Sequence, residues 1–279
     1  MIKKIIAISL SFIGIITVCY LSATITNTKQ ITSRQEILKN SKHGLNDETI
    51  QIVYFSDLYY TNFIDSEFLN NAINKINLYK PEIIIFGGDL IDKSKSSTIS
   101  SINKDELIQA LKSLDAKYGK YAVLGENDDE QAIDVLKQAD FKVLSNESFE
   151  ARTNKDNVIN IIGINSNVDD IANCDNAFIG VNQNNYTLVV AHHPDTLNNV
   201  INQNFDYMLA GHTRGGQIYF PIISLFSRDY GCKEFFRGKH TKSGKTLDIT
   251  NGLGRTKYNA RFLADSEIVA YRLSITCSK

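Results

Sequence analysis

Five apolar runs in this 279-residue chain each end in side chains that are able to bind a metal ion. Carboxylate and amide oxygens mixed with imidazoles suit Mn, Zn or Fe, and the four cysteines show no zinc-like spacing. At any single position, a capping aspartate or a packed histidine is the ordinary explanation, but ligand-type side chains at five run ends favour one shared metal site. These side chains are Asp57, Asp89, Glu126 with Asn127, His192 with His193, and His212.

The runs also predict how these side chains come together. Stretches such as "TIQIVYFSD" and "PEIIIFGGD" are nearly continuous in apolar residues, which is typical of strands buried on both faces. Helical spacing over 65–80, 103–119 and 129–140 separates the early strands, with Asn103 and Gly119 as expected caps. This alternation predicts a largely parallel sheet with its chemistry at the carboxyl ends of the strands. Because the second half is richer in strands, a two-sheet α/β sandwich is expected.

Several segments resemble the calcineurin-like metallophosphoesterase superfamily, in particular its membrane-anchored bacterial branch. They are "FSDLY", "GGDLID", "VLGEND", "AHHPD", "AGHTRGGQIYFP" and "NGLGR", in the family's order, between about Ile50 and Leu273. The resemblance implies a four-layer α/β/β/α sandwich. It also implies hydrolysis of a phosphate ester, phosphodiester or pyrophosphate.

In that family two metal ions share one bridging aspartate, which corresponds here to Asp89. The first ion also takes an aspartate, here Asp57, and two histidines. Tyr59 and Arg214 stand in the places of those two histidines. The resemblance therefore implies a first site reduced to two carboxylates.

The second metal site is nearly complete under the same comparison. It keeps Asp89, His192 and His212, and the family adds an asparagine. An alignment without a gap puts Glu126 in the asparagine's place, whereas a one-residue insertion would make Asn127 the ligand. The expected cofactor is one divalent ion, Mn, Zn or Fe, with two ions as the alternative.

Arg214 and Asn127 are the candidate catalytic residues that the comparison implies. A guanidinium cannot bind a metal ion, but it offers a fixed charge and a planar pair of donors to a phosphoryl group, with His193 as a second phosphate-binding residue. Asn127 can donate a hydrogen bond but no proton to a leaving group, which favours pyrophosphates or other substrates with good leaving groups. The alternative hypothesis is a catalytically inactive protein that binds a phosphate-bearing ligand on the same fold.

The N-terminus predicts a membrane anchor. Lys3 and Lys4 precede an uncharged run that ends at Thr24, and about 20 apolar residues span a bilayer core of ~30 Å. We expect residues 1–24 to be a single-pass signal-anchor, with a cleaved signal peptide as the alternative. Residues 25–46 are predicted to be a stalk linker and 47–279 the metallophosphoesterase domain, outside the cell. A lipid-linked phosphate or a sugar nucleotide of the cell envelope would then be the substrate.

The net charge and the spacing of two glycine-rich or acidic segments argue against other classes of function. The net charge of -1 provides no basic field for nucleic acid. "NGLGR" and "FGGD" lack the G-x-G-x-x-G pattern of a dinucleotide site, and "GENDDE" lacks the spacing of a calcium loop. Nothing in the sequence indicates an oligomeric state.

Overall fold

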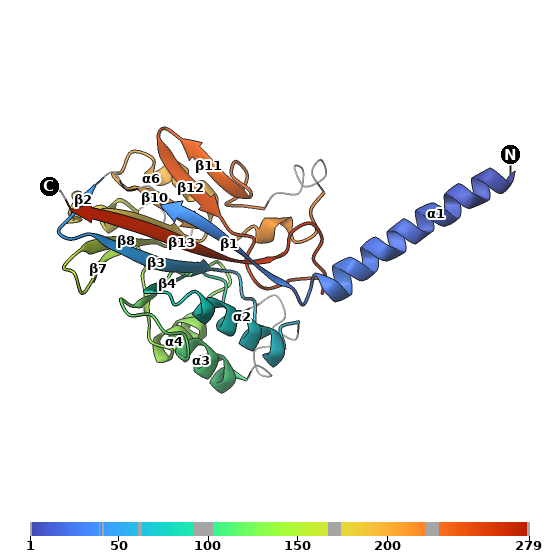
Figure 1. The fold of residues 1–279 in the computed structure, drawn as a ribbon, viewed down its shortest axis with the longest axis horizontal. Coiled ribbons are helices and arrows are strands. Elements are labelled where there is room, and N and C mark those ends of the chain that lie inside the picture. The colour runs from blue at the N-terminus through green and yellow to red at the C-terminus, as the bar shows by residue number, and fades with distance from the viewer. Residues whose placement is uncertain are drawn as a thin grey trace.

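Two stacked sheets form the centre of the structure, a computed structural model (Figure 1). It describes residues 2–38, 40, 42–60, 63–91, 103–166, 174–220 and 229–277. The first sheet has the order β1-β13-β3-β4-β5-β6, with β2 paired to β13, and the second has the order β11-β12-β10-β9-β8-β7. The strands are β1 (Ile31–Leu38), β2 (His43–Gly44), β3 (Glu48–Phe55), β4 (Ile83–Phe86), β5 (Lys120–Ala122), β6 (Phe141–Val143), β7 (Glu147–Arg152), β8 (Val158–Ile164), β9 (Tyr186–Ala191), β10 (Tyr207–Ala210), β11 (Gly238–Lys242), β12 (Lys245–Ile249) and β13 (Ser266–Cys277).

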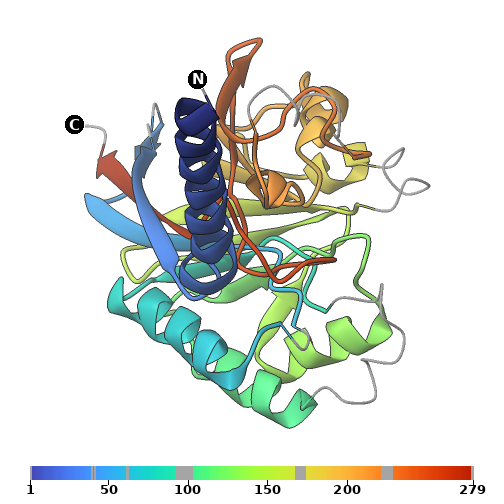
Figure 2. The same ribbon diagram turned by 90° about the vertical axis from the view of Figure 1, so that its right-hand side faces the viewer.

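Helices cover the outer faces of both sheets (Figure 2). Three amphipathic helices pack their apolar sides on the first sheet, and shorter elements cover the second sheet. The expected α/β/β/α sandwich is therefore confirmed. The covering elements are α2 (Ser66–Leu78), α3 (Lys104–Lys112), α4 (Glu130–Gln138), the 3-10 turn η3 (Cys174–Phe178) and α6 (Leu197–Val200).

The side chains of β3 alternate between two cores. Val53 and Phe55 pack under the helices, whereas Ile52 and Tyr54 pack between the two sheets. Because successive side chains of a strand point to opposite faces, a strand between two apolar layers must be apolar on both. This explains the near-continuous apolar runs of the sequence.

Helix caps agree only in part with the sequence-based prediction. The Asn103 side chain accepts a hydrogen bond from the Glu106 N–H at 3.2 Å, so the predicted N-cap of α3 is confirmed. The helix ends at Lys112, however, and Gly119, with φ of 111°, lies in the turn that leads into β5. The prediction that Gly119 caps the helix was therefore wrong.

The polar segment 25–46, predicted as a stalk linker, instead contributes a strand to the first sheet. β1 runs parallel to β13, with its register from Ile31 opposite Ser266 to Leu38 opposite Leu273. Ile31 and Leu38 are buried at the two ends of the strand, with more exposed residues between them. The prediction failed because β1 pairs with a strand more than 200 residues away, and that partner leaves no local signal.

Helix α1 (Ile2–Leu21) projects from one end of the domain (Figure 1). The span Lys3–Thr26, with a hydropathy of 2.3, has the length and composition to cross a membrane, which signal sequences share. A π-helical turn (Ser22–Thr26) continues the helix into the domain. There the Arg261 N–H donates to the Ala23 carbonyl at 2.9 Å. No flexible linker separates α1 from the sandwich.

Candidate active site

The carboxyl ends of four strands bring the predicted ligands together. Asp57 follows β3, Asp89 follows β4, His192 follows β9 and His212 follows β10, and all four side chains are buried. Asp57, Asp89 and His212 adopt left-handed backbone conformations, with φ of 53°, 59° and 68°. Such conformations cost on the order of 1–3 kcal/mol in non-glycine residues and cluster at functional sites. The convergence predicted from the sequence is therefore found in the structure.

Two histidines each have one ring nitrogen fixed by the backbone and the other directed into the site. His192 Nδ1 lies 2.7 Å from the Gly87 carbonyl, and His212 Nε2 lies 2.7 Å from the Tyr230 carbonyl. Because a carbonyl only accepts, these nitrogens carry the protons. His192 Nε2 and His212 Nδ1 are buried and have no hydrogen-bond partner in the described part of the chain. They are available as metal ligands.

Glu126 lies between these free nitrogens. Its carboxylate oxygens are 3.1 Å from His192 Nε2 and 3.0 Å from His212 Nδ1, close enough for ion pairs but not aligned as hydrogen bonds. Asp89 Oδ2 is 3.2 Å from the same His192 nitrogen. Ring nitrogens without hydrogen-bond partners that face carboxylates in a buried space form a donor set suited to a divalent cation once they lose their protons.

Asn127 takes a different position from the one expected of a ligand. Its backbone N–H donates to Asp89 Oδ1 at 3.0 Å, and its side-chain nitrogen donates to Asp89 Oδ2 at 2.9 Å. The amide nitrogen, not the oxygen, therefore faces the site. Of the two alternatives for the asparagine's place, the structure places Glu126 among the histidines and leaves Asn127 as a donor to Asp89.

His193, expected to bind phosphate, also joins this cluster. Its Nε2 lies 3.1 Å from Glu126 Oε2, the oxygen that faces His192. Ligand-type atoms of Glu126, His192, His193 and His212 all lie within 4.8 Å of one another, as do those of Asp57, Asp89 and His192. The double histidine in "AHHPD" was the available sequence signal, but only the fold could bring both rings to one point.

Tyr59 and Arg214 contact each other at the other side of Asp89. Arg214 Nη1 donates to the Tyr59 hydroxyl at 2.6 Å, and this hydroxyl donates to Asp89 Oδ2. Tyr59 is 1% exposed, and its ring lies within the site. Burial and the Asp89 carboxylate raise the pKa of Tyr59 well above its usual value, so it is a neutral phenol that donates to Asp89. A phenolate ligand is therefore disfavoured.

The charges of the cluster depend strongly on one another. Burial alone would favour a neutral His192, but the carboxylates of Asp89 and Glu126 raise its pKa well above the usual value. Burial similarly opposes the charge on His212, yet Cys232 and the Glu126 carboxylate beside the ring raise its pKa to about 9. Burial would keep Glu126 protonated, but His192 lowers its pKa. Protonated imidazoles thus neutralise the carboxylates, and a bound cation would replace those protons.

A cleft of about 570 Å³ opens onto the cluster. Its lining includes Glu126, His193, His212, Asn165, Asp229 and Tyr230. Arg214 reaches Asp229 at 3.8 Å through Nη2, which is too long for a hydrogen bond. A phosphate-sized ligand has access to the cluster from this cleft.

Asp128 is a site residue that the sequence reading did not identify. Its carboxylate accepts from the N–H groups of Asp89 at 2.8 Å, Leu90 at 2.8 Å and Gly125 at 2.9 Å. It therefore holds the loop after β4 against the loop after β5. Two of these three hydrogen bonds come from a loop distant in sequence, and the acidic "ENDD" run therefore gives no local indication of the role of Asp128.

Residues 50–215 match the family model described as calcineurin-like phosphoesterase, which covers more than half of the chain. An uncharacterized metallophosphoesterase, YkuE, from Bacillus subtilis is 24% identical over 92% of this chain and 88% of its own length. Phosphodiesterase YaeI from Escherichia coli is 25% identical over 82% of this chain and 83% of its own. UDP-2,3-diacylglucosamine pyrophosphatase LpxG from Chlamydia trachomatis is 23% identical over 82% of this chain and 84% of its own.

Proposed function

Because this chain belongs to the calcineurin-like phosphoesterase family, and is thus a hydrolase, we propose that it is a membrane-anchored phosphoesterase with a single-metal site. One divalent ion and Arg214 share the role that two ions have in the family. The proposal rests on one observation, namely that two chemically different groups of side chains surround Asp89. One side has unpaired histidine nitrogens, and the other has Tyr59 and Arg214.

The residues present fit a divalent cation on one side of Asp89. His192 Nε2, His212 Nδ1, Glu126 and Asp89 would hold it, and His193 lies within reach. The imidazoles of this set suit Zn, and its carboxylates also admit Mn or Fe. When bound, such an ion supplies Lewis acidity at the phosphoryl oxygens.

Arg214 supplies the positive charge on the other side. Burial would lower its pKa, but Tyr59, Asp57 and Asp89 raise it, so the guanidinium remains charged. Nη1 donates to Tyr59 and to the His212 carbonyl, which orients the group. Nη2, which lies 3.8 Å from Asp229, would then bind a non-bridging phosphoryl oxygen. Tyr59 links Arg214 to Asp89, because its hydroxyl accepts a hydrogen bond from the guanidinium and donates one to the carboxylate.

Asn127 limits the choice of substrate. It donates to Asp89 and has no proton to give to a departing alkoxide. A pyrophosphate or a diester with a stable leaving group therefore suits the site better than a simple alkyl ester. Two of the relatives, one named a phosphodiesterase and the other a pyrophosphatase, support this class.

Helix α1 would anchor the domain as a single-pass span, with the sandwich on the extracytoplasmic side. Its 24-residue apolar span and its continuous connection to the domain support this arrangement. The positive charges Lys3 and Lys4 before the span favour an N-terminus inside the cell.

Metal counting on the full chain in detergent micelles tests the proposed site. The metal-stripped protein should take up one Zn or Mn ion per chain and then hydrolyse bis(p-nitrophenyl) phosphate. His212→Ala should lose the ion, whereas His240→Ala, a histidine outside the cluster, should retain it. Two tight ions in the wild type would contradict the single-metal site, and one ion with phosphate binding but no turnover would favour the inactive alternative.

A further inference from the structure

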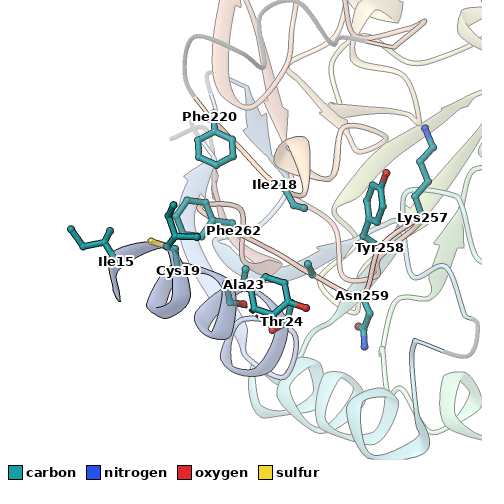
Figure 3. A pocket seen from close by; sticks show the side chains of 13 residues that line it. Ile15, Cys19, Ala23, Thr24, Ile218, Phe220, Lys257, Tyr258, Asn259 and Phe262 are labelled. Atoms are coloured by element: carbon teal, nitrogen blue, oxygen red, sulfur yellow. Dashed lines mark hydrogen bonds between the residues drawn. The ribbon is translucent and has the colours of Figure 1, made fainter. Parts of the chain in front are cut away.

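A second cavity, of about 860 Å³, lies between the last turns of α1 and two loops of the domain (Figure 3). Its size is that of a small-molecule site. Its walls are mainly apolar on both sides. Ile15, Cys19 and Tyr20 contribute from the helix, and Ile218, Phe220 and Phe262 contribute from the domain.

The domain wall is built from two segments, 217–220 and 256–263, which we name the rim. Two hydrogen bonds join the two segments of the rim. The Tyr219 N–H donates to the Phe262 carbonyl, and the Phe262 N–H donates to the Gln217 carbonyl, both at 2.9 Å. The rings of Phe220 and Phe262 pack with centroids 5.5 Å apart. The rim is thus an ordered structure with an apolar surface.

The rim exposes this apolar surface beside α1. Phe220, Tyr258 and Leu263 are 45%, 67% and 56% exposed. Exposed apolar side chains gathered on one segment are unfavourable in water and are typical of a binding surface. Lys257 lies on the same rim, where a cation attracts anionic lipid headgroups.

The rim, the end of α1 and the catalytic loops are joined by one chain of hydrogen bonds. The Arg261 N–H donates to the Ala23 carbonyl at 2.9 Å, and Arg261 Nη2 donates to the Gly254 carbonyl at 2.6 Å. The Gly254 N–H in turn donates to the Asp57 carbonyl at 2.6 Å. Strand β3 also points towards the end from which α1 projects (Figure 1). The catalytic face and the cavity therefore lie at the same end of the domain.

We propose that this cavity holds an acyl chain of the substrate, a membrane lipid whose phosphate reaches the catalytic cleft. The inference rests on the proposed anchoring by α1 and on the proposed phosphoesterase activity. We infer a lipid chain as the occupant because one wall of the cavity belongs to the candidate membrane span. The residues Ile15, Cys19 and Tyr20 of this wall lie inside the apolar span Lys3–Thr26. A cavity with one wall on a membrane span opens where lipid chains are the surrounding medium.

Fluorescence quenching tests the occupant, since the chain contains no tryptophan. The full-length variant Phe220→Trp is reconstituted into phosphatidylcholine vesicles whose acyl chains carry bromine, which quenches tryptophan on contact. We expect strong quenching. Leu45→Trp, beside β2 at the opposite end of the domain (Figure 1), should remain unquenched. Equally weak quenching of both variants would overturn the proposal.

A pair of diesters with the same leaving group tests the substrate class. Hexadecyl p-nitrophenyl phosphate should have a kcat/KM at least about tenfold above that of the ethyl diester, since burial of only two methylenes is worth that much. Phe220→Glu should lower kcat/KM for the hexadecyl diester much more than for the ethyl diester, and Leu45→Glu should change neither. If Phe220→Glu fails to fold, Tyr258→Glu replaces it on the same rim.

The outcomes separate this inference from the proposed function. Equal rates on both diesters, with turnover intact, would refute the acyl-chain site and leave the phosphoesterase standing. Turnover of neither diester would contradict the proposed activity, and the quenching of Phe220→Trp would then decide the cavity by itself.

Discussion

Arg214 Nη1 lies 2.6 Å from the hydroxyl oxygen of Tyr59, and the family resemblance assigns these two side chains to the places of two histidine ligands of a first metal ion. The pair is coupled in structure, because the phenol donates to Asp89 while it accepts from the guanidinium. A fixed organic cation thus lies where a metal ion is expected from the resemblance.

Tyr59→His combined with Arg214→His should restore a second metal ion. The double variant would give Asp57 and Asp89 two imidazole partners, a complete transition-metal ligand set. Metal analysis of the purified protein should rise from one ion to two per chain, and either single variant should stay at one. A ratio that remains at one in the double variant would show that the ligand places are misassigned.

Arg214→Ala should lower kcat/KM by roughly 10²–10³-fold, the usual effect of removing one preorganised donor to developing charge. The ion count should not change, because Arg214 is not among the ligands. Arg214→Lys should recover only part of the rate, since an ammonium lacks the planar pair of donors. Steady-state kinetics on a chromogenic diester measure the effect, and Arg152→Ala, at an exposed arginine of β7, is the matched control outside the cleft. An unaltered rate would remove Arg214 from the mechanism.

His193→Gln should weaken metal binding by roughly 10–100-fold without abolishing it. The reason is that His193 Nε2 contacts the Glu126 oxygen that also faces His192. Chelator competition measures the dissociation constant. A loss of affinity as complete as that of His212→Ala would make His193 a full ligand, whereas no loss would return it to the phosphate-binding role.

Metal affinity should keep rising with pH up to about 9. Bound metal must displace the proton of His212, whose pKa is raised to about 9, so protons compete below that pH and cease to compete above it. An unperturbed histidine would stop competing near pH 6.5. Chelator competition between about pH 6 and about pH 9.5 gives the profile. A plateau already present at pH 7 would contradict the raised pKa.

Arg34→Ala should destabilise the domain by about 3 kcal/mol, because it leaves a buried carboxylate unpaired. Arg34 on β1 donates to both oxygens of Asp248, at 2.8 and 2.9 Å, and Asp248 is fully buried. Urea denaturation measures the free energy of unfolding. Arg152→Ala removes an exposed pair with Glu150 and should cost less than about 1 kcal/mol. Similar small costs for both would mean that β1 contributes little to the fold.

The sequence by itself determined the strands that carry the ligands. Asp57, Asp89, His192 and His212 each follow an apolar run, and such a run forms a buried strand whichever neighbours it finds. Because carboxyl ends of parallel strands meet at one edge, their convergence was also predictable. The N-cap at Asn103 was also predictable, because a cap is a local feature that involves only the next three residues.

Only the tertiary structure decided the features that depend on distant partners. Glu126 and Asn127 are adjacent in sequence, and the packing of β5 against β4 determined which one faces the histidines. The pairing of β1 with β13, and the burial of Tyr59 between Asp89 and Arg214, likewise join segments far apart in the chain. A local pattern specifies backbone conformation and side-chain chemistry, but the distance between two side chains is fixed by long-range packing, which no short window of sequence contains.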